Sequence, residues 1–566
     1  MLIISSLFLV FSTALFSRRD ITIFYSRIGI IILFFCIYLS YNNLLISYLD
    51  NGIGLFGGLF YISGITQSFH IFVFFISFFI LNMTGFFPRK LISKEYISLN
   101  KLLLTKLEYV KNLVVSNIIL KKGEQYTILE YTLMLLFIII GSVLLISSSD
   151  LVSIYLAIEL QSYGLYLLCA MYRNSELSTS SGLTYFLIGG LASCFILLGI
   201  GLIYANLGIT FLDSFYVINN LAIIIDEQNV TLFIPYCLLI LSVGFLLKIS
   251  AAPFHFWSPD VYDGIPTIVT TFVAIIAKIS ILILFLQLVH YTNTNSNSFL
   301  YIFSYPWTSS LLLSSLLSLI IGTILGLTQI RIKKLYAYST ISHLGFILLA
   351  LTIDSIESIQ AFLFYLIQYS ISNLNAFIIL VAIGYSLYAY NDKNINYNNL
   401  IDKNNSPIQF IIQLKGYFQI NSMLALSLAI TLFSFAGVPP LVGFFGKQMV
   451  FSAALQEGFI FITLIGVLTS VISGVYYLFV IKTMFFDDYS FTYLNKLKDI
   501  RIPAFILQNN KIIKNIYFNS KFALSSSLTI IISILTLFIL LFMFIPNEWL
   551  HISNLLVLVL FLPGII

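Results

Sequence analysis

The sequence predicts an all-α, polytopic membrane protein with about fourteen transmembrane helices. Of its 566 residues, 59% are hydrophobic and 9% are charged. Soluble globular proteins carry about 25% charged residues. The apolar residues gather in stretches of about 20, the length that crosses a bilayer as a helix. The basic residues of the chain are also unevenly distributed: they gather in alternate connections between these stretches. A single water-soluble core is therefore excluded.

The apolar stretches define the predicted helices in order. The first stretch precedes Arg18 and Arg19 instead of following basic residues, so we expect a retained membrane helix and not a cleaved signal peptide. The last apolar run, 555–566, is too short to span and is expected to lie on or in the membrane interface. The helices are predicted at 2–17, 21–41, 69–87, 126–147, 151–172, 180–206, 230–257, 266–289, 308–330, 335–353, 358–388, 423–456, 459–481 and 523–545.

The basic residues predict the orientation of this bundle. All but three of the 28 Lys and Arg residues fall in, or close to, alternate connections of the fourteen-helix scheme, and the other connections hold none. Such an asymmetry is the positive-inside signal. Both termini are therefore expected to face away from the positive side, and the net charge of +5 reflects membrane orientation rather than nucleic-acid binding.

Two features that could suggest other functions carry little weight. The loop at 52–57 reads GIGLFG, which matches a dinucleotide fingerprint, but no βαβ pattern surrounds it. Four scattered cysteines, Cys36, Cys169, Cys194 and Cys237, lack the spacing of a metal or iron–sulfur site. No connection is long enough for a separate catalytic domain.

Two predicted helices are interrupted. The stretch 244–266 begins inside an apolar helix and breaks at Pro253, which cannot donate to the helical ladder. The stretch 423–456 is too long to span unbroken at 1.5 Å per residue, and Gly437–Pro440 marks its break. We expect discontinuous helices near 249–254 and 437–440, and hence two related halves, as in transporters with broken helices.

Ionisable residues within the apolar stretches are the candidate functional residues. A central charge is costly in a bilayer, by roughly 2.5–3.5 kcal/mol on insertion scales, and usually marks an ion path. Glu159, Lys248, Lys278 and Lys447 fall inside predicted helices, two of the lysines beside breaks. Lys278 has no evident acidic partner and lies too deep for its stem to reach either surface. His343 lies among Ser and Thr residues.

Several of these residues also have a purely structural interpretation. Glu159 and Lys248 could form an inert ion pair, Lys447 could extend to the interface, and His343 could be a satisfied core residue. The remaining charged residues are given no ion-carrying role: His255, Asp260 and Asp263 are expected to cap or anchor the first break, and Glu130, Asp354 and Glu357 lie near helix ends. In an apolar environment a lysine can release its proton, and a nearby carboxylate opposes that release. This is the minimum chemistry of a proton relay.

Three motifs carry a family resemblance. They are SSDLVSIYLAIELQS at 148–162, KISAAPFHFWSPDVYDGIPT at 248–267 and KKLYAYSTISHLG at 333–345. They resemble the antiporter-like membrane subunits of respiratory complex I, over about residues 126–485. The resemblance implies fourteen helices, two inverted five-helix repeats and a central polar axis. It also implies that Glu159 and Lys248 form a coupled pair, that Lys278 bridges the halves, and that Lys447 is the lysine of the second half.

The resemblance also divides the chain. Residues 1–125 would hold three N-terminal helices and a matrix loop, 126–290 the first antiporter-like half, and 299–485 the second half. Residues 486–566 would hold a matrix loop, the last helix and the apolar tail.

The function implied is proton translocation within NADH:ubiquinone oxidoreductase. The chain itself would hold no cofactor, with NADH, FMN, iron–sulfur clusters and ubiquinone in other subunits. Its partners would be neighbouring membrane-arm subunits and lipids, without nucleic acid. The chain would cross the mitochondrial inner membrane with both termini toward the intermembrane space. Two alternatives remain: a subunit of a multi-subunit cation/proton antiporter or membrane-bound hydrogenase, and a structural spacer without its own proton path.

Overall fold

A computed structural model describes most of the chain. The described residues are 1–15, 22–44, 52–86, 89–92, 130–172, 175–215, 217, 228–292, 306–387, 390–392, 408–488, 491–493, 507–508, 511–512, 521–524 and 526–561. The predicted connections at 88–125 and around 487–519 lie largely outside these residues, and about half of the connection at 391–421 does as well. Many of the basic residues that predict orientation are in these segments.

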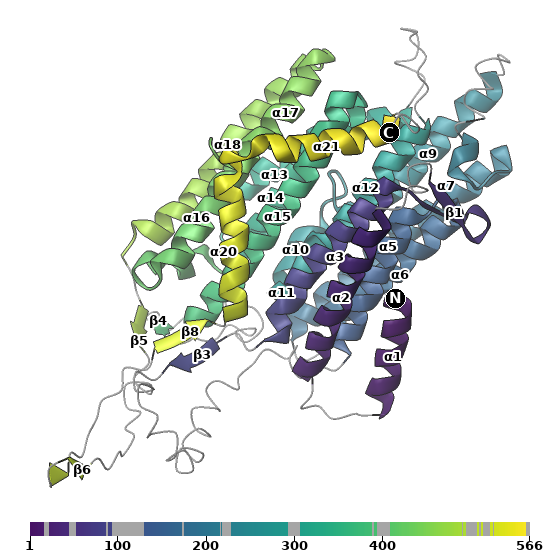
Figure 1. The fold of residues 1–566 in the computed structure, drawn as a ribbon. Coiled ribbons are helices and arrows are strands. Elements are labelled where there is room, and N and C mark those ends of the chain that lie inside the picture. The colour runs from purple at the N-terminus through teal and green to yellow at the C-terminus, as the bar shows by residue number, and fades with distance from the viewer. Residues whose placement is uncertain are drawn as a thin grey trace.

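The described chain is a bundle of helices (Figure 1). Ten helices or helix pairs are long and apolar enough to cross a membrane, and four shorter apolar helices add to them. Together these make fourteen candidate helices among the described residues, which is consistent with the predicted number of about fourteen transmembrane helices. The first three helices are α1 (Leu2–Leu15), α2 (Thr22–Leu44) and α3 (Gly64–Gly85). Packing of α2 on α3, and of α3 on α5 (Tyr131–Ser147), joins them to the bundle.

The next helices form two groups with the same closing contact. The first contains α5, α6 (Leu151–Ala170), α7 (Glu176–Leu207), α9 (Gln228–Ile249), α10 (Trp257–Gly264), α11 (Thr267–Ala274) and α12 (Ile276–Thr292). The second contains α13 (Pro306–Leu327), α14 (Ile332–Ile353), α15 (Ile356–Leu387), α16 (Ser422–Ala436), α17 (Val442–Gln456) and α18 (Ile460–Phe485). In the first group α12 packs back on α5, and in the second α18 packs back on α13.

Both predicted interruptions are present. The helix that carries Lys248 ends at Ile249 and resumes as α10 at Trp257, while α16 ends at Ala436 and α17 begins at Val442. A third interruption was not predicted: the expected continuous helix 266–289 is broken for one residue at Ile275, whose φ and ψ are −117° and −66°. The backbone hydrogen bond from Ile279 to Ile275 continues across it. No Pro or Gly stands there, so the sequence offers no signal for this break.

The C-terminal part contains a helix where the sequence predicts only an apolar tail, 555–566, on or in the membrane interface. Helix α20 (Ser526–Leu541) is followed by the 3-10 turn η10 (Phe542–Phe544) and by α21 (Pro546–Phe561). Figure 1 shows α21 running across one end of the bundle instead of alongside the other helices. It packs against α15 and α3. Phe538 and Trp549, one from each helix, meet edge to face at 4.9 Å and fix the corner.

Short antiparallel strand pairs lie beyond the ends of the helices. Strand β1 (Ile53–Leu55) pairs with β2 (Phe60–Ile62) across the turn η3 (Phe56–Gly58), so the glycine-rich loop is a hairpin and not the turn of a βαβ unit. The other pairs are β3 (Arg89–Ile92) with β8 (Lys521–Leu524), β4 (Tyr390–Asp392) with β5 (Phe491–Tyr493), and β6 (Leu507–Gln508) with β7 (Lys511–Ile512).

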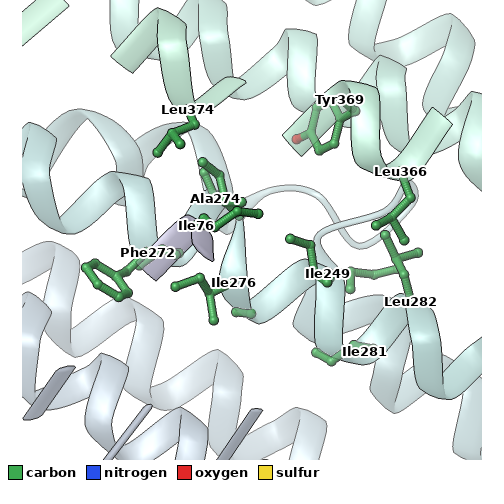
Figure 2. Packing of buried hydrophobic residues seen from close by; sticks show 14 of the residues in the cluster. Ile76, Ile249, Phe272, Ala274, Ile276, Ile281, Leu282, Leu366, Tyr369 and Leu374 are labelled. Carbon is green, nitrogen blue, oxygen red and sulfur yellow. The ribbon is translucent and has the colours of Figure 1, made fainter. Parts of the chain in front are cut away.

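The core lies around the contact of α11 with α15. Figure 2 labels Ala274 of α11, Ile276, Ile281 and Leu282 of α12, and Leu366, Tyr369 and Leu374 of α15 as members of one cluster of buried side chains. Each of these side chains is at most 3% exposed. Lys278 belongs to α12 and is 2% exposed, so it lies buried within this part of the bundle.

Glycines let the first two helices of each group approach closely. A Cβ added at Gly141 of α5 would lie 2.7 Å from the backbone nitrogen of Gln161 on α6, and one at Gly322 of α13 would lie 2.7 Å from that of Ser342 on α14. Small residues at helix–helix contacts are typical of membrane proteins.

We predict that Gly322→Val destabilises the protein by about 1–3 kcal/mol, because the added side chain forces α13 away from the α14 backbone. The measurement is the thermal midpoint of the purified protein in detergent, together with its yield from membranes. Gly190→Val on α7 is the matched control, since a Cβ there meets nothing within 4 Å. Equal losses in both variants would show that the close contact is unimportant.

Candidate functional site: buried cations at helix interruptions

Glu159 and Lys248 meet between α6 and α9. The Asp150 side chain caps α6 by accepting from the backbone nitrogens of Val152 and Ser153, which fixes the start of the helix two turns before Glu159. Lys248 Nζ lies 3.4 Å from Glu159 Oε1. The lysine side chain is 6% exposed and the glutamate side chain 14%. The sequence analysis thus paired two residues that the structure brings into contact.

A tyrosine completes this first cluster. Lys248 Nζ donates to the Tyr166 hydroxyl over 3.2 Å. Tyr166 follows Glu159 by seven residues, two helical turns, so both side chains lie on one face of α6. The sequence analysis did not single out Tyr166, although this spacing could have found it. Lys248 therefore has a charged and a neutral partner.

Lys278 lies deeper and has a different environment. Its Nζ donates to Thr340 Oγ1 of α14 over 3.2 Å and lies 5.6 Å from the ring centroid of Tyr262 on α10. The residue is 2% exposed. Among the described residues no carboxylate lies within ion-pair distance of it, in agreement with the sequence. A hydroxyl oxygen and an aromatic face are therefore its partners.

His343 is held by two tyrosines. Its Nδ1 lies 2.8 Å from the Tyr365 hydroxyl of α15, and its Nε2 lies 3.3 Å from the Tyr477 hydroxyl of α18. The rings of Tyr369 and Phe435 lie 5.6 and 5.3 Å away. Each hydroxyl can donate or accept a hydrogen bond, so both ring nitrogens of the histidine have partners, as expected for a satisfied core residue.

Lys447 occupies the second interruption. Its Nζ donates to the carbonyl oxygens of Phe435 and Ala436 over 2.9 and 3.0 Å. These are the last carbonyls of α16, which lack partners within the helix and carry the negative end of its dipole. The residue is 6% exposed, so the ammonium group binds the helix end and does not extend to the surface.

These groups form three clusters and not one continuous chain. Within the described residues, a hydrogen bond joins predicted site residues directly only at Glu159 and Lys248. Between Lys278 and His343 lies Tyr369, which interacts with Thr340 and whose ring lies beside His343. Phe435 lies beside both Lys447 and His343: its carbonyl oxygen accepts from Lys447, and its ring lies 5.3 Å from the histidine ring. Hydroxyl side chains thus lie between some of the predicted site residues, and a joint role of these residues in ion transfer stays a prediction.

The structure buries one lysine, Lys333, that the sequence does not predict to be buried. Lys333 falls in a predicted connection on the basic side, yet it is 0% exposed and its Nζ donates to the Ile265 carbonyl oxygen over 2.7 Å. It lies in the first turn of α14, beside the basic residues Arg331 and Lys334. A run of basic residues at a helix start gives no signal that one of them turns inward.

A small polar cavity lies apart from the lysines, at the end of the bundle near β2. Its volume is about 10 Å³, and it is lined by Tyr61, Ser147, Ser148, Ser149, Leu212, Gln287 and Tyr291. Burial, with a smaller effect of the Asp213 carboxylate, raises the pKa of Tyr61, so this hydroxyl stays neutral.

In the part of the chain that the structure describes, no three His, Cys, Asp or Glu side chains are grouped so that they could hold a metal ion. The expectation that this chain holds no cofactor of its own remains a prediction.

Comparisons with known proteins agree with this architecture. A protein-family model described as NADH:quinone oxidoreductase/Mrp antiporter, transmembrane, matches residues 148–473. Two solved structures share the fold: respiratory complex I from Thermus thermophilus with bound aureothin (TM-score 0.68, 21% identity, 97% of both chains) and the Mrp complex from Dietzia (TM-score 0.71, 15% identity, 98% of this chain and 96% of that one).

Two curated relatives are more similar in sequence. NADH-ubiquinone oxidoreductase chain 2 from Rhizopus oryzae is 43% identical over 99% of this chain and 100% of its own. NADH-quinone oxidoreductase subunit N from Rhodospirillum rubrum is 34% identical over 68% of this chain and 73% of its own.

The fold and the matched family model define an antiporter-like membrane subunit. Within that class, the chain belongs to the family of NADH-ubiquinone oxidoreductase chain 2. The sequence motifs resemble subunit 2 of the mitochondrial enzyme most among the antiporter-like subunits, and the comparisons confirm this resemblance.

We predict that Gly437→Ala destabilises the protein more than Gly458→Ala. Both glycines have positive φ, 84° and 83°, so both substitutions carry a similar backbone cost, about 1 kcal/mol. Only at Gly437 would the new Cβ lie 3.0 Å from Lys447 Cδ, whereas nothing lies within 4 Å of it at Gly458. Thermal midpoints in detergent provide the measurement, and identical midpoints would show that Lys447 tolerates displacement.

Proposed function

We propose that this chain is a proton-translocating membrane-arm subunit of respiratory NADH:ubiquinone oxidoreductase. The observation that carries the proposal is Lys278, an ammonium group buried at a helix interruption with a hydroxyl and a ring as its partners. A cation held without a counter-charge in an apolar bundle is costly. A purely structural role gives no reason to keep it.

The other groups extend this role into a relay. Glu159, Lys248, Lys278, His343 and Lys447 act catalytically in proton transfer, with the tyrosines beside them as hydrogen-bonding neighbours. Lys248 keeps its proton while Glu159 is charged and close, and it releases the proton once Glu159 is neutralised or moves away. Lys447 is held by the end of α16, so a movement of α16 relative to α17 changes the stability of its charged form.

The two helix groups correspond to two antiporter-like halves, 126–290 and 299–485, related as inverted five-helix repeats. Their matching closing contacts, α12 on α5 and α18 on α13, support this division. An interruption beside a lysine in each half supports it as well. Residues 1–125 and 486–566 flank the halves.

The surrounding complex supplies the chemistry that this chain lacks. The relatives are named as oxidoreductases of NADH and ubiquinone or quinone, so NADH, FMN, iron–sulfur clusters and ubiquinone are assigned to other subunits. Neighbouring membrane-arm subunits, antiporter-like ones included, and lipids are the partners. The chain is a multi-pass protein of the mitochondrial inner membrane.

Two other functions make different predictions. A subunit of a cation/proton antiporter would purify without NADH oxidation, and the fold is shared with an Mrp complex. The 43% identity to an NADH-ubiquinone oxidoreductase chain favours the respiratory complex. A structural spacer would tolerate neutralisation of its buried lysines.

The test replaces Lys278 within the assembled complex. Lys278→Met keeps the side-chain volume and removes the titrating group, so complex abundance should stay near normal while NADH oxidation and coupled proton uptake fall. Lys278→Arg should be nearly as harmful, because a guanidinium does not release its proton at accessible pH. Both activities are measured in sealed membranes and normalised to assembled complex. Full pumping in Lys278→Arg would mean that charge alone suffices and that no proton passes through Lys278.

Orientation is a separate prediction. We expect the basic connections to face the matrix and both termini to face the intermembrane space, because basic loops remain on the inner side. Asn100→Cys and Asn510→Cys should react with an impermeant maleimide only after the inner membrane is opened. The unmodified chain, whose Cys194 is exposed on α7, provides the background. Labelling of these cysteines in intact mitoplasts would contradict the predicted orientation.

A further inference from the structure

Helix α10 is a separate short helix whose position depends on side contacts. The interruption precedes it and Pro266 follows it, so it shares no continuous hydrogen-bond ladder with α9 or α11. Its eight residues are fewer than an isolated helix needs to be stable. Contacts with α7 and α14 hold it in place.

The end of α10 is attached to the beginning of α14 by two contacts, which we call the α10–α14 joint. An Arg331 guanidinium nitrogen donates to Asp263 Oδ2, and Lys333 Nζ donates to the Ile265 carbonyl oxygen over 2.7 Å. The Asp263 side chain is 8% exposed and Arg331 38%. Lys333 is fully buried. Charge-assisted bonds to partly buried groups are stronger than neutral ones.

A third contact beside the joint differs in exposure. Lys334 Nζ lies 2.7 Å from Asp260 Oδ1, with the two side chains 28% and 72% exposed. Exposed ion pairs contribute little to stability, since solvent screens them. This pair joins the same two helices and serves as a control for the joint.

The two helices that the joint connects also enclose Lys278. Tyr262 of α10 presents its ring to the ammonium group, and Thr340 of α14 accepts its hydrogen bond. Tyr262 precedes Asp263 by one residue. Thr340 lies two turns after Lys333. A shift of α10 away from α14 would therefore separate the two partners of Lys278.

At its other end α10 reaches the Glu159–Lys248 cluster. Trp257 donates from Nε1 to the Leu247 carbonyl oxygen over 2.9 Å and stacks on Tyr185 at 4.8 Å. Tyr185 meets Tyr166, the hydroxyl partner of Lys248, at 4.9 Å. One short helix thus contacts the surroundings of both lysines of the first half.

We propose that Asp263, Arg331 and Lys333 are positioning residues that hold α10 against α14 and so maintain the site of Lys278 between the two halves. The inference rests on the proposed function, in which Lys278 transfers protons. The joint touches no proton-carrying group itself. It acts by keeping Tyr262 and Thr340 on either side of one ammonium group.

The test uses Asp263→Asn in the assembled complex, which keeps the side-chain shape and removes the charge. NADH oxidation and proton uptake per assembled complex should fall by roughly 3- to 10-fold, within the range over which such residues modulate a coupled site. Arg331→Gln should give the same loss and serves if Asp263→Asn assembles poorly. Asp260→Asn should change neither activity. The exchange Asp263→Arg with Arg331→Asp should recover activity to within about two-fold, because the ion pair is restored.

A double variant separates positioning from general stability. If the joint acts through Lys278, Asp263→Asn combined with Lys278→Met should be no worse than Lys278→Met alone. Multiplied losses would overturn the proposal, and so would normal activity of Asp263→Asn beside an impaired Lys278→Met. Normal activity of Lys278→Met would overturn the proposed function itself.

Discussion

A buried ammonium group in an apolar bundle needs an oxygen or an aromatic face beside it, and the rest of this structure follows from that need. An unbroken helix has no free backbone oxygen in its interior. Where α16 ends at Ala436, the last carbonyls become available, and Lys447 binds two of them. Lys248 lies one residue before the end of α9. At Lys447 the interruption and the cation therefore occur together for a physical reason.

The same need separates the cations into clusters with different partners. Lys248 has a carboxylate and a hydroxyl, Lys278 a hydroxyl and a ring, and Lys447 two carbonyls. The stability of each charged form thus responds to a different change: neutralisation of Glu159, displacement of α10 or α14, and displacement of α16. The proposed relay therefore has three separate points of control, one through the charge of Glu159 and two through displacement of helices.

The sequence was sufficient for features that depend on composition and on strong helix breakers. Long apolar stretches located the helices, and Pro253 and Gly437–Pro440 located two interruptions. Ionisable residues within apolar stretches identified Glu159 and the three lysines as candidates. The break at Ile275 has no such residue, because it is a one-residue distortion set by packing. Lys333 looks like any basic residue at a helix start, and only the approach of the Ile265 carbonyl shows that it is buried. The partners of Lys278 come from α10 and α14, and no local pattern predicts a contact between them.

The contacts of the C-terminal region bear on the order in which the protein can fold. Strand β8 pairs with β3, and both α20 and α21 pack on α3, so the end of the chain closes against its beginning at both ends of the bundle. During synthesis α3 is made more than four hundred residues before these partners. Contacts so distant in sequence form slowly, and α3 must wait in the membrane with its later contact surface uncovered. Closure of the bundle is therefore a late step, because α3 reaches its final environment only after residues 521–561 have been made.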